Sequence, residues 1–446
     1  MTARGAVDVI VVGGGFAGVT AARDLSLAGH SVVLLEARNR LGGRTSVVEW
    51  HGRQVELGGM WVHHLQPFVW REIVRAGCGV RRLGDAEVTL FKGATGSTHV
   101  TDADRDELDR AWNAYVRGAE ALGDPFALDP GAPEVATVDA QTMAQRLDGL
   151  GLEPRVRERL RSGLCAWANG RVEEAGALFP VRLFAMSGFS LRALEAATTD
   201  FVIDGGGTRE LVETMVRQAD IDIRFDTVAV SVHHGPEGIR VETADGGAFT
   251  SRALVVALPI NALPSLSFDP VLPAAAGRTI ATRQTSTGFK LLIKVRGGNP
   301  RVDVSSVGTA FAHVLTDRRE FADGSQLLYV FGPDARDLDG AGTAEVQRHL
   351  DDVVDGMTVE DILWHDWTTD PQADGTWAVH PPGWFARHSG ALEGPFGSVF
   401  FAGSDLADGW VSHIDGAIES GTRTAHAVDA RLHAMSDGEH AEGPDA

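Results

Sequence analysis

Two short runs of apolar residues near the start of the chain enclose a segment with helical spacing. Val7–Val12 and Ser31–Glu36 are rich in β-branched and aliphatic residues, which is typical of buried parallel strands. Between them, the apolar residues of Val19–Ala28 recur with the period of a helix, and Gly29 marks its end. The three segments predict a βαβ unit, in which two parallel strands are joined by a helix.

The rest of the chain divides into a helical part and a later part that is rich in strands. From about Asp102 to Leu194, Ala, Leu, Arg and Glu recur with helical periodicity, so we expect a mainly helical insertion. Strand patterns return after the glycine cluster Asp204–Thr208, and a last helix is predicted at about Ile414–Ala434. The predicted strands are Ile221–Phe225, Val228–Val232, Ile239–Glu242, Ala253–Leu258, Phe289–Val295, Gln326–Phe331 and Ser398–Ala402.

Composition and charge narrow the class of protein. The 446 residues are 43% hydrophobic and carry a formal net charge of −21, which fits a globular protein of about two domains. So acidic a chain is expected to repel nucleic acid and anionic membrane surfaces. No transmembrane segment or signal peptide is apparent, so we expect a cytoplasmic location. The polar, acidic end of the chain, residues 436–446, is expected to be a disordered tail.

Cysteine and histidine residues do not indicate a disulfide framework or a metal site. The two cysteines, Cys78 and Cys165, are expected to be reduced and mostly buried. His63–His64 and His233–His234 are adjacent pairs, and neighbours in a strand point to opposite faces, which makes them poor chelates. We therefore predict no metal site.

A glycine motif follows the first predicted strand and opens the first predicted helix. Gly13, Gly15 and Gly18 have the spacing GxGxxG, and Glu36 lies at the end of the next strand. Glycines allow a tight turn and close approach of the backbone to a pyrophosphate, and a helix N-terminus favours negative charge. The acidic residue can accept hydrogen bonds from ribose hydroxyls. This arrangement predicts a dinucleotide-binding site.

Four further segments resemble motifs of one enzyme family. Glu36–Arg44 (EARNRLGGR) and Gly58–Trp61 (GGMW) resemble flavin-contacting segments of the flavin-containing monoamine oxidases and their bacterial relatives. Near the other end of the chain, Phe401–Asp405 (FAGSD) resembles the family segment whose acidic residue meets the ribityl and pyrophosphate region. Trp410–Ala417 (WVSHIDGA) resembles the segment that opens the last helix beneath the flavin ring.

The resemblance implies an α/β fold with two domains and an FAD cofactor. The first is a Rossmann-type FAD-binding domain built from discontinuous segments, residues 1–78, 202–281 and 391–435. The second is an α+β substrate-binding domain, residues 79–201 and 282–390, which carries the helical insertion. The expected cofactor-binding residues are Gly13, Gly15, Ala17, Gly18, Glu36, Ala37, Arg38, Gly43, Arg44, Gly59, Met60, Trp61, Val228, Trp367, Gly403, Ser404, Asp405, Ser412, His413, Ile414 and Ala417.

Lys290 stands out because it interrupts an apolar strand pattern. A buried ammonium group without a partner is costly, so a lysine in such a strand calls for a reason. The family has a lysine at this place that holds a water against the flavin N5, and Lys290 matches it. The alternative is a lysine on the solvent side of an edge strand, since Lys290, Leu292 and Lys294 share one face.

The loop around Thr376 and Trp377 resembles the substrate-side loop of the family. In the mitochondrial enzymes a cysteine of this loop bonds covalently to the flavin, and an adjacent tyrosine walls the substrate site. The matching residues here are Thr376 and Trp377, so non-covalent FAD is expected. The second aromatic wall residue is matched by His413, and we expect Lys290, Trp377 and His413 to act in catalysis.

The second half of the chain is most similar to the bacterial hydroxynicotine oxidases and related nicotine-type amine oxidases. Shared features are His365–Trp367, Gly375–Trp377 and Gly403–Asp405. That subgroup carries a substrate-site asparagine, which Asn169 matches. Its active-site tyrosine is replaced at the corresponding place by Thr316, which argues against a pyridine-alkaloid substrate. The expected substrate contacts are therefore Trp377, His413, Asn169 and Thr316.

The resemblance implies an FAD-dependent oxidase of a primary or secondary, aryl-bearing amine. The small-molecule amine loses a hydride equivalent to the flavin N5 and becomes an imine or iminium, and O2 is reduced to hydrogen peroxide. A homodimer is a further expectation. Two alternatives stay open at this point. One is an L-amino-acid oxidase, in which Arg182 or Arg283 would clamp a carboxylate; the other is a flavin dehydrogenase or desaturase with a different electron acceptor.

Overall fold

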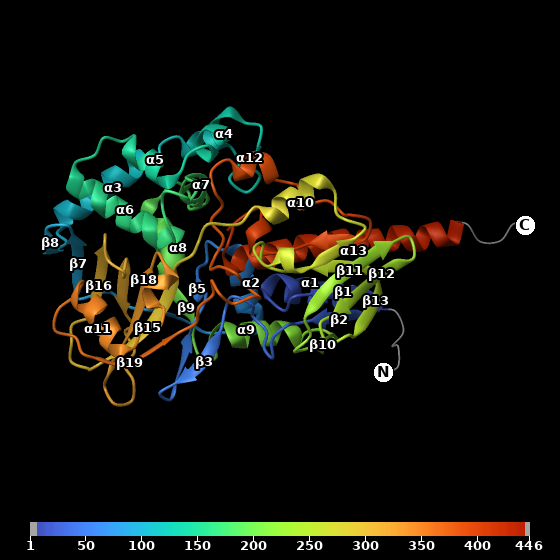
Figure 1. Ribbon diagram of the computed structural model, residues 1–446, viewed down its shortest axis with the longest axis horizontal. Helices are drawn as coiled ribbons and strands as arrows, with labels where there is room; N and C mark the ends of the chain where they lie inside the picture. Colours follow the sequence, from blue (N-terminus) through green and yellow to red (C-terminus); the bar gives the residue numbers. More distant parts are fainter. Residues whose placement is uncertain (1–6, 442–446) are drawn as a thin grey trace, which may run out of the picture.

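Two large sheets lie side by side in the computed structural model, which describes residues 7–441 (Figure 1). The 8-stranded sheet has the order β10-β2-β1-β13-β12-β11-β14, with β20 also paired to β13. Its strands β10, β2, β1, β13 and β20 are parallel, and β11–β13 are an antiparallel meander. The strands are β1 (Val7–Val12), β2 (Val32–Leu35), β10 (Asp222–Arg224), β11 (Ala229–Gly235), β12 (Gly238–Thr243), β13 (Ala248–Val256), β14 (Ser267–Asp269) and β20 (Val399–Phe401).

Helices from the same parts of the chain as the first sheet cover one face of that sheet. α1 (Phe16–Leu27) packs against α13 (Ile414–Ala441) and α9 (Gly207–Val216), and α2 (Pro67–Ala76) packs against α13. Apolar residues of β1, such as Val9 and Val11, are fully buried beneath them. The predicted βαβ unit of β1, α1 and β2 is therefore confirmed, and so is the assembly of this nucleotide-binding part from separate stretches of the chain.

The 7-stranded sheet has the order β19-β15-β18-β17-β16-β7-β8. α11 (Thr343–Asp351) packs on one face, and α6 (Pro154–Ala168) packs on the other. The strands are β7 (Val88–Gly93), β8 (Gly96–His99), β15 (Phe289–Val295), β16 (Val302–Ser306), β17 (His313–Thr316), β18 (Gln326–Gly332) and β19 (Val359–Trp364). Together with the helices, this part has the α+β character that the sequence predicted.

The helical insertion is also confirmed. It contains α3 (Asp102–Tyr115), α4 (Pro133–Asp139), α5 (Met143–Asp148), α6, α7 (Leu178–Met186) and α8 (Leu191–Thr199), with the 3₁₀ turn η1 (Ala119–Leu122). Its apolar faces form a core of their own around Tyr115, Leu160 and Leu164. In Figure 1 these helices lie above the second sheet. The domain boundaries stay a prediction.

Short elements connect the two parts. Small sheets are formed by β3 (Val47–Trp50) with β4 (Arg53–Glu56), and by β5 (Trp61–Val62), β9 (Phe201–Ile203) and β6 (Val80–Arg82). Further turns and helices are η2 (Leu263–Ser265), α10 (Ala274–Ala281), η3 (Ala335–Leu338), α12 (Trp384–His388) and η4 (Ser404–Leu406). The sequence patterns did not indicate β16, β17 or the strands of the two small sheets, because strands of two to five residues are too short for a clear alternation of polar and apolar residues.

The end of the chain departs from the expectation of a disordered tail. α13 continues from Ile414 to Ala441, beyond Ser436, where the tail was predicted to begin. The stretch includes Gly438 but no proline, so every residue keeps the backbone N–H that a helix needs. Residues 442–446 of the predicted tail lie outside the described residues.

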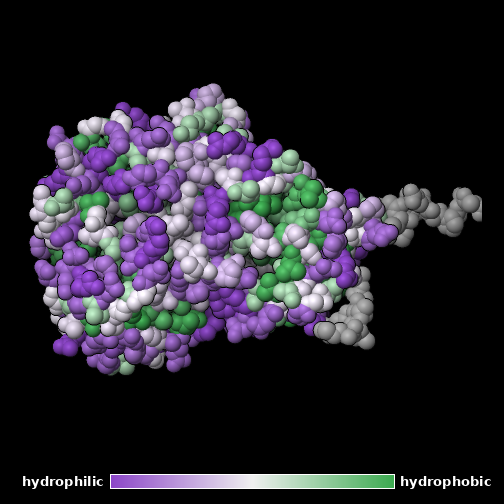
Figure 2. Space-filling view, in the orientation of Figure 1, coloured by the Kyte–Doolittle hydropathy of each residue, from purple (hydrophilic) through white to green (hydrophobic). Residues whose placement is uncertain are grey.

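The molecular surface bears on two further expectations. Within residues 7–441, no helix combines the length and apolarity needed to cross a bilayer. Hydrophilic residues cover most of the face seen in Figure 2, and a hydrophobic area lies over the first sheet at the right. Val230 at the end of this sheet and Val271 beside it are exposed apolar side chains. Contiguous apolar surface is typical of contact surfaces; the homodimer stays a prediction.

Candidate active site

A cavity of about 840 Å³ reaches from the glycine turn of the first sheet to the upper face of the second. Most of the residues expected to bind cofactor or substrate line it. They are Gly13, Gly15, Ala17, Glu36, Ala37, Arg38, Gly43, Arg44, Gly59, Met60, Trp61, Asn169, Val228, Lys290, Trp367, Thr376, Trp377, Gly403, Ser404, Ser412, His413, Ile414 and Ala417. Gly18, Asp405 and Thr316 are outside this lining.

The glycine turn has the geometry of a phosphate cradle. Gly13 has a φ of 105°, and a Cβ added there would come within 2.6 Å of the Ala257 carbonyl oxygen. Gly15 precedes α1, and a Cβ there would meet nothing closer than Gly43 Cα at 3.9 Å. Bare backbone at a helix N-terminus suits a pyrophosphate. Gly18 lies behind the cradle and leaves no room for a side chain, because an added Cβ would lie 1.9 Å from the Gly13 carbonyl oxygen.

Glu36 places a buried carboxylate beside the glycine turn. One of its oxygens accepts a hydrogen bond of 2.6 Å from the Gly14 N–H, and the other accepts one of 2.8 Å from the Arg38 N–H. The side chain is held at the end of β2, at the carboxyl edge of the parallel strands. This is the place at which a ribose hydroxyl meets an acidic residue in dinucleotide-binding folds. The donor set therefore fits a dinucleotide.

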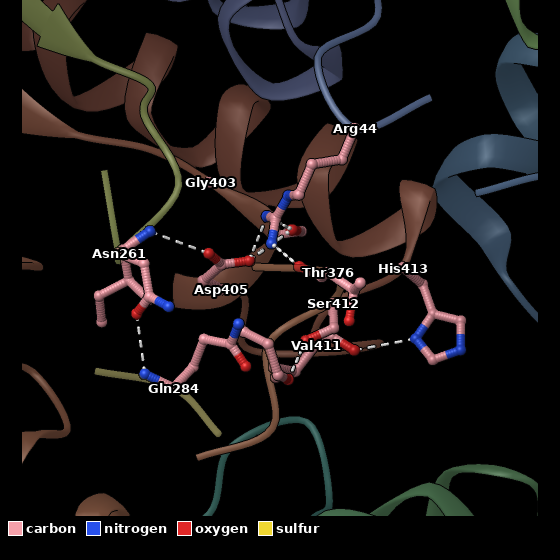
Figure 3. A network of polar contacts seen from close by, with 12 residues as sticks. Arg44, Asn261, Gln284, Thr376, Gly403, Asp405, Val411, Ser412 and His413 are labelled. Atoms are coloured by element: carbon pink, nitrogen blue, oxygen red, sulfur yellow. Dashed lines mark hydrogen bonds and ion pairs between the residues drawn. The ribbon is translucent and has the colours of Figure 1, made fainter. Parts of the chain in front are cut away.

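Arg44 and Asp405 join two segments from opposite ends of the chain, as Figure 3 shows. The Arg44 guanidinium forms an ion pair with Asp405 and donates to Ser404 Oγ at 2.9 Å and to the Thr376 carbonyl oxygen at 2.8 Å. Asp405 also accepts from the Ile260 N–H at 3.0 Å. Burial disfavours the Asp405 carboxylate, but Arg44 outweighs it and keeps the Asp405 pKa below its usual range. Asp405 thus holds Arg44 in the cavity wall instead of facing the cavity itself.

Lys290 lies in β15, between β19 and β18, and is buried. Its Nζ donates to the Gly58 carbonyl oxygen at 2.8 Å, lies 3.1 Å from Met60 Sδ and stands over the Tyr329 ring at 5.2 Å from the centroid. Burial lowers the pKa of Lys290 to about 7, and the negative charge of Glu56 opposes part of this shift. The edge-strand alternative is therefore wrong, since this central strand turns Lys290 into the cavity.

Trp377 and His413 both line the cavity, each fixed by a backbone carbonyl. Trp377 Nε1 donates to the Trp167 carbonyl oxygen at 2.8 Å, and its ring meets Phe331 edge-on with centroids 6.4 Å apart. His413 Nδ1 lies 2.8 Å from the Val411 carbonyl oxygen, so this nitrogen carries the proton (Figure 3). Burial lowers the pKa of His413, which keeps the imidazole neutral.

Asn169 ends α6 in a left-handed conformation, with a φ of 41°. Its side-chain Nδ2 donates to Thr376 Oγ1 at 3.0 Å, and its backbone carbonyl oxygen accepts from the Gly288 N–H at 2.7 Å. Asn169 thereby connects the helical insertion to the loop that carries Trp377. Thr316, in contrast, is buried away from the cavity, where its Oγ1 accepts from the Val302 N–H at 3.0 Å. Its assignment as a substrate contact is corrected: β17 presents His313 to the cavity instead.

Sequence reasoning missed most of the aromatic wall. Phe331, Trp167, Trp112 and Phe179 also line the cavity, and the Trp112 and Trp167 rings are tilted against each other with centroids 4.7 Å apart. Phe331 lies in a strand that was predicted, but the strand is buried on both faces and its pattern does not reveal which side chains reach the cavity. The contacts of Trp112 and Trp167 come from two helices and could not be read from one segment.

Neither arginine considered for a carboxylate clamp faces the cavity. Arg182 donates to the carbonyl oxygens of Pro125 and Asp408, and burial lowers its pKa to about 10. Arg283 is exposed and paired with Asp374 at 2.6 Å. Arg159 does line the cavity, but it is paired with Asp104 at 2.8 Å.

Comparisons with known proteins agree with this geometry. The chain matches the family model of the flavin containing amine oxidoreductases over residues 16–429. It is 31% identical over 441 residues to a pseudooxynicotine dehydrogenase of a Pseudomonas species, covering 95% of this chain and 86% of that protein. It is 30% identical over 437 residues to the (S)-6-hydroxynicotine oxidase of Paenarthrobacter nicotinovorans, covering 96% and 99%. The solved structure of a cyclohexylamine oxidase from Brevibacterium oxydans superimposes with a TM-score of 0.82 at 20% identity, over 96% and 100% of the two chains.

The family match confirms the resemblance drawn from the motifs at the two ends of the chain. It also assigns the cofactor class, since the family is flavin-containing and the bare glycine cradle with Glu36 fits a flavin dinucleotide. The similarity at 30% identity extends over nearly the whole of both chains, so both the nucleotide-binding and the substrate-binding parts are included. This chain belongs to the flavin-containing amine oxidoreductases.

Proposed function

We propose that this enzyme oxidises the C–N bond of a primary or secondary amine that carries an aromatic ring, with FAD bound non-covalently and O2 reduced to hydrogen peroxide. The observation that carries the proposal is the continuity of one cavity. The glycine cradle lines one part of it, and Trp61, Trp377 and Phe331 line another, with Lys290 in the same wall. Flat apolar walls favour an aryl group, and contact with the faces of aromatic rings favours a nitrogen that develops positive charge.

The residues around the cavity bind and desolvate the amine. When bound, the flavin supplies the acceptor for a hydride from the carbon beside the amine nitrogen. Trp377 and Phe331 exclude water from the nitrogen, which favours the free base over the ammonium ion. His413 is held neutral, so it places no positive charge beside the developing iminium. Water then hydrolyses the imine, and O2 takes up the two electrons with two protons as hydrogen peroxide.

Non-covalent attachment is supported by the chemistry of the loop beside the cofactor. Thr376 stands where a thioether would need a cysteine, and Asn169 donates a hydrogen bond to its hydroxyl. Neither Cys78 nor Cys165 lines the cavity. Acid precipitation of the holoenzyme should release the flavin into the supernatant, measured by its visible absorbance. Yellow colour retained on the washed pellet would contradict this proposal.

A panel of amines tests the reaction. Under anaerobic conditions, arylalkylamines should bleach the visible absorbance of the bound flavin, and admission of air should restore it with release of hydrogen peroxide. Bleaching by α-amino acids but not by simple amines would support the L-amino-acid oxidase alternative. That alternative loses support because Arg182 and Arg283 are outside the cavity lining.

The identity of the electron acceptor needs a separate measurement. One similar protein is named a dehydrogenase and another an oxidase, so the relatives support both kinds of acceptor. The reduced enzyme should be reoxidised by O2 faster than by a quinone or a cytochrome at equal concentration. The opposite order in a stopped-flow comparison would favour a dehydrogenase.

A further inference from the structure

A single row of side chains crosses five strands of the second sheet and faces the cavity. Lys290, Phe331, His313, Ser305 and Phe91 are direct neighbours on β15, β18, β17, β16 and β7. All five line the cavity. Alternate residues of these strands, including Leu291, Val330, Val314 and Val304, form the core on the opposite face. The row is therefore the floor of the cavity. Figure 1 shows the helical insertion above this sheet.

The spacing of the strands gives the distance between the two ends of this row. Neighbouring strands lie about 4.8 Å apart, so the backbones at Lys290 and His313 are separated by about 10 Å. Phe331 lies between them in the row. A substrate with one aromatic ring, oriented with its amine toward Lys290, would present the far side of its ring to His313.

His313 is half of a polar pair. Its Nε2 lies 2.8 Å from Asp303 Oδ1, and the carboxylate can only accept, so Nε2 carries the proton. In the neutral ring, Nδ1 is then an acceptor, and Nδ1 has no hydrogen-bond partner among residues 7–441. Asp303 also lines the cavity, and the side chains of both residues are partly exposed, which leaves them accessible to a ligand.

Charged groups of both signs surround this end of the cavity. Asp109 of α3 and Glu195 of α8 line the cavity together with Asp303. Arg159, a buried cation in this wall, forms an ion pair with Asp104, but its guanidinium nitrogens make no hydrogen bond within the described residues. This end of the cavity thus holds both acceptors and cationic donors, and the free acceptor that faces a ring substituent is His313 Nδ1.

We infer that His313 and Asp303 form a distal subsite that selects amines whose aromatic ring carries a hydrogen-bond donor, a hydroxyl or an ammonium group, on the side away from the oxidised carbon. The inference rests on the proposed function, with the oxidised amine oriented toward the Lys290 end of the row. The competing explanation is that the His313–Asp303 contact only fastens β17 to β16. In that case its loss would affect all amines equally.

Turnover of matched ring-substituted amines separates these explanations. Benzylamine has no distal group, 4-hydroxybenzylamine adds a hydroxyl, 1,4-bis(aminomethyl)benzene adds an ammonium group, and 4-(aminomethyl)benzoate adds a carboxylate. The wild type should show a kcat/KM about tenfold higher for the donor-bearing amines than for benzylamine, and lower for the benzoate. His313→Phe should remove the preference while leaving the value for benzylamine within about twofold.

A matched control pair exists on the surface of the first sheet. His233 lies 3.4 Å from Asp269 and is not part of the cavity. His233→Phe should keep the full preference for ring donors. Asp303→Asn keeps the shape of the subsite but weakens the fixation of the His313 tautomer, so it should lose part of the preference even if His313→Phe fails to fold.

Binding without turnover tests the subsite independently of the reaction. α,α-Dimethylbenzylamine has no hydrogen on the carbon beside nitrogen and cannot lose a hydride. Calorimetric titration should show that its 4-hydroxy derivative binds the wild-type holoenzyme about tenfold more tightly, and that His313→Phe abolishes the difference. Equal binding of the two compounds to the wild type would overturn the inference. A binding difference without turnover of any amine would leave the subsite and refute the proposed function.

Discussion

Among single residues, Lys290 illustrates how the fold alters the chemistry of a side chain. Its ammonium donates to the Gly58 carbonyl oxygen and lies over the Tyr329 ring, yet it has no carboxylate within ion-pair distance in the described chain. Burial lowers the pKa of Lys290 to about 7, against the attraction of Glu56. The side chain therefore loses its proton at a lower pH than an exposed lysine does.

We expect Lys290→Met to retain flavin but to slow its reduction or reoxidation by about tenfold or more. The rate should also lose a pH-dependent step near pH 7, because the titrating ammonium is gone. Stopped-flow traces between pH 6 and about 9 measure both effects. Lys294→Met is the matched control, since Lys294 lies on the same face of β15 but pairs with Asp323 and Glu360. A wild-type profile in Lys290→Met would remove Lys290 from the reaction.

Among the elements, α1 depends on close contact with the turn that precedes it. Gly18 lies in the first turn of α1, and a side chain there would strike the Gly13 carbonyl oxygen. Glycine at this position lets the helix begin directly above the phosphate cradle. The requirement is steric, since Gly18 itself has no contact with the cavity.

We expect Gly18→Ala to displace the cradle, to destabilise the protein by about 1–3 kcal/mol and to reduce the flavin content of the purified enzyme at least severalfold. Thermal unfolding and the ratio of visible to ultraviolet absorbance measure these changes. Gly277→Ala in α10 is the matched control. Nothing lies within 4 Å of a Cβ there, so the substitution should stabilise α10 slightly, by about 0.5–1 kcal/mol. Full flavin content in Gly18→Ala would contradict the steric explanation.

In the whole molecule, Arg44 and Asp405 hold the beginning and the end of the chain together at the cavity. The two residues are separated by 361 positions in sequence, and the Asp405 side chain is almost completely buried. Asp405 has a lowered pKa in the folded protein, against about 3.9 in an unfolded chain. Its ionised form therefore contributes stability above about pH 4, and this contribution is lost as the pH falls through the lower, folded-state pKa.

We expect Asp405→Asn to lower the free energy of unfolding by about 3 kcal/mol at neutral pH, because it leaves Arg44 without its buried partner. The difference from the wild type should shrink as the pH falls below about 4. Urea unfolding at pH 7 and at pH 3 measures both. Glu213→Gln removes one half of the exposed pair with Arg217 and should cost less than about 1 kcal/mol at either pH. A constant difference between the two pH values would refute the role of the Asp405 charge.

Local patterns were sufficient for the nucleotide-binding part. The strand β1, the turn Gly13–Gly18 and the end of β2 at Glu36 depend on strand period, glycine conformation and helix capping, which are properties of neighbouring residues. The motifs at the two ends also identified the family, which the comparison over residues 16–429 confirms. In contrast, the predicted tail from Ser436 was wrong as far as Ala441, because composition does not reveal where an established helix ends.

The substrate side of the cavity was decided by tertiary structure. Whether Lys290 lies on an edge or in the centre of a sheet depends on the order of strands, which no single strand encodes. His313 and Thr316 are three residues apart in β17 and point to opposite faces of the sheet. An alignment that is wrong by an odd number of residues therefore assigns a side chain of the core to the cavity. The sequence by itself thus determined the flavin cradle and the enzyme family. Only the order of strands, with β18 between β15 and β17, and the packing of α6 on this sheet decided which side chains line the cavity, since those contacts join segments distant in the chain.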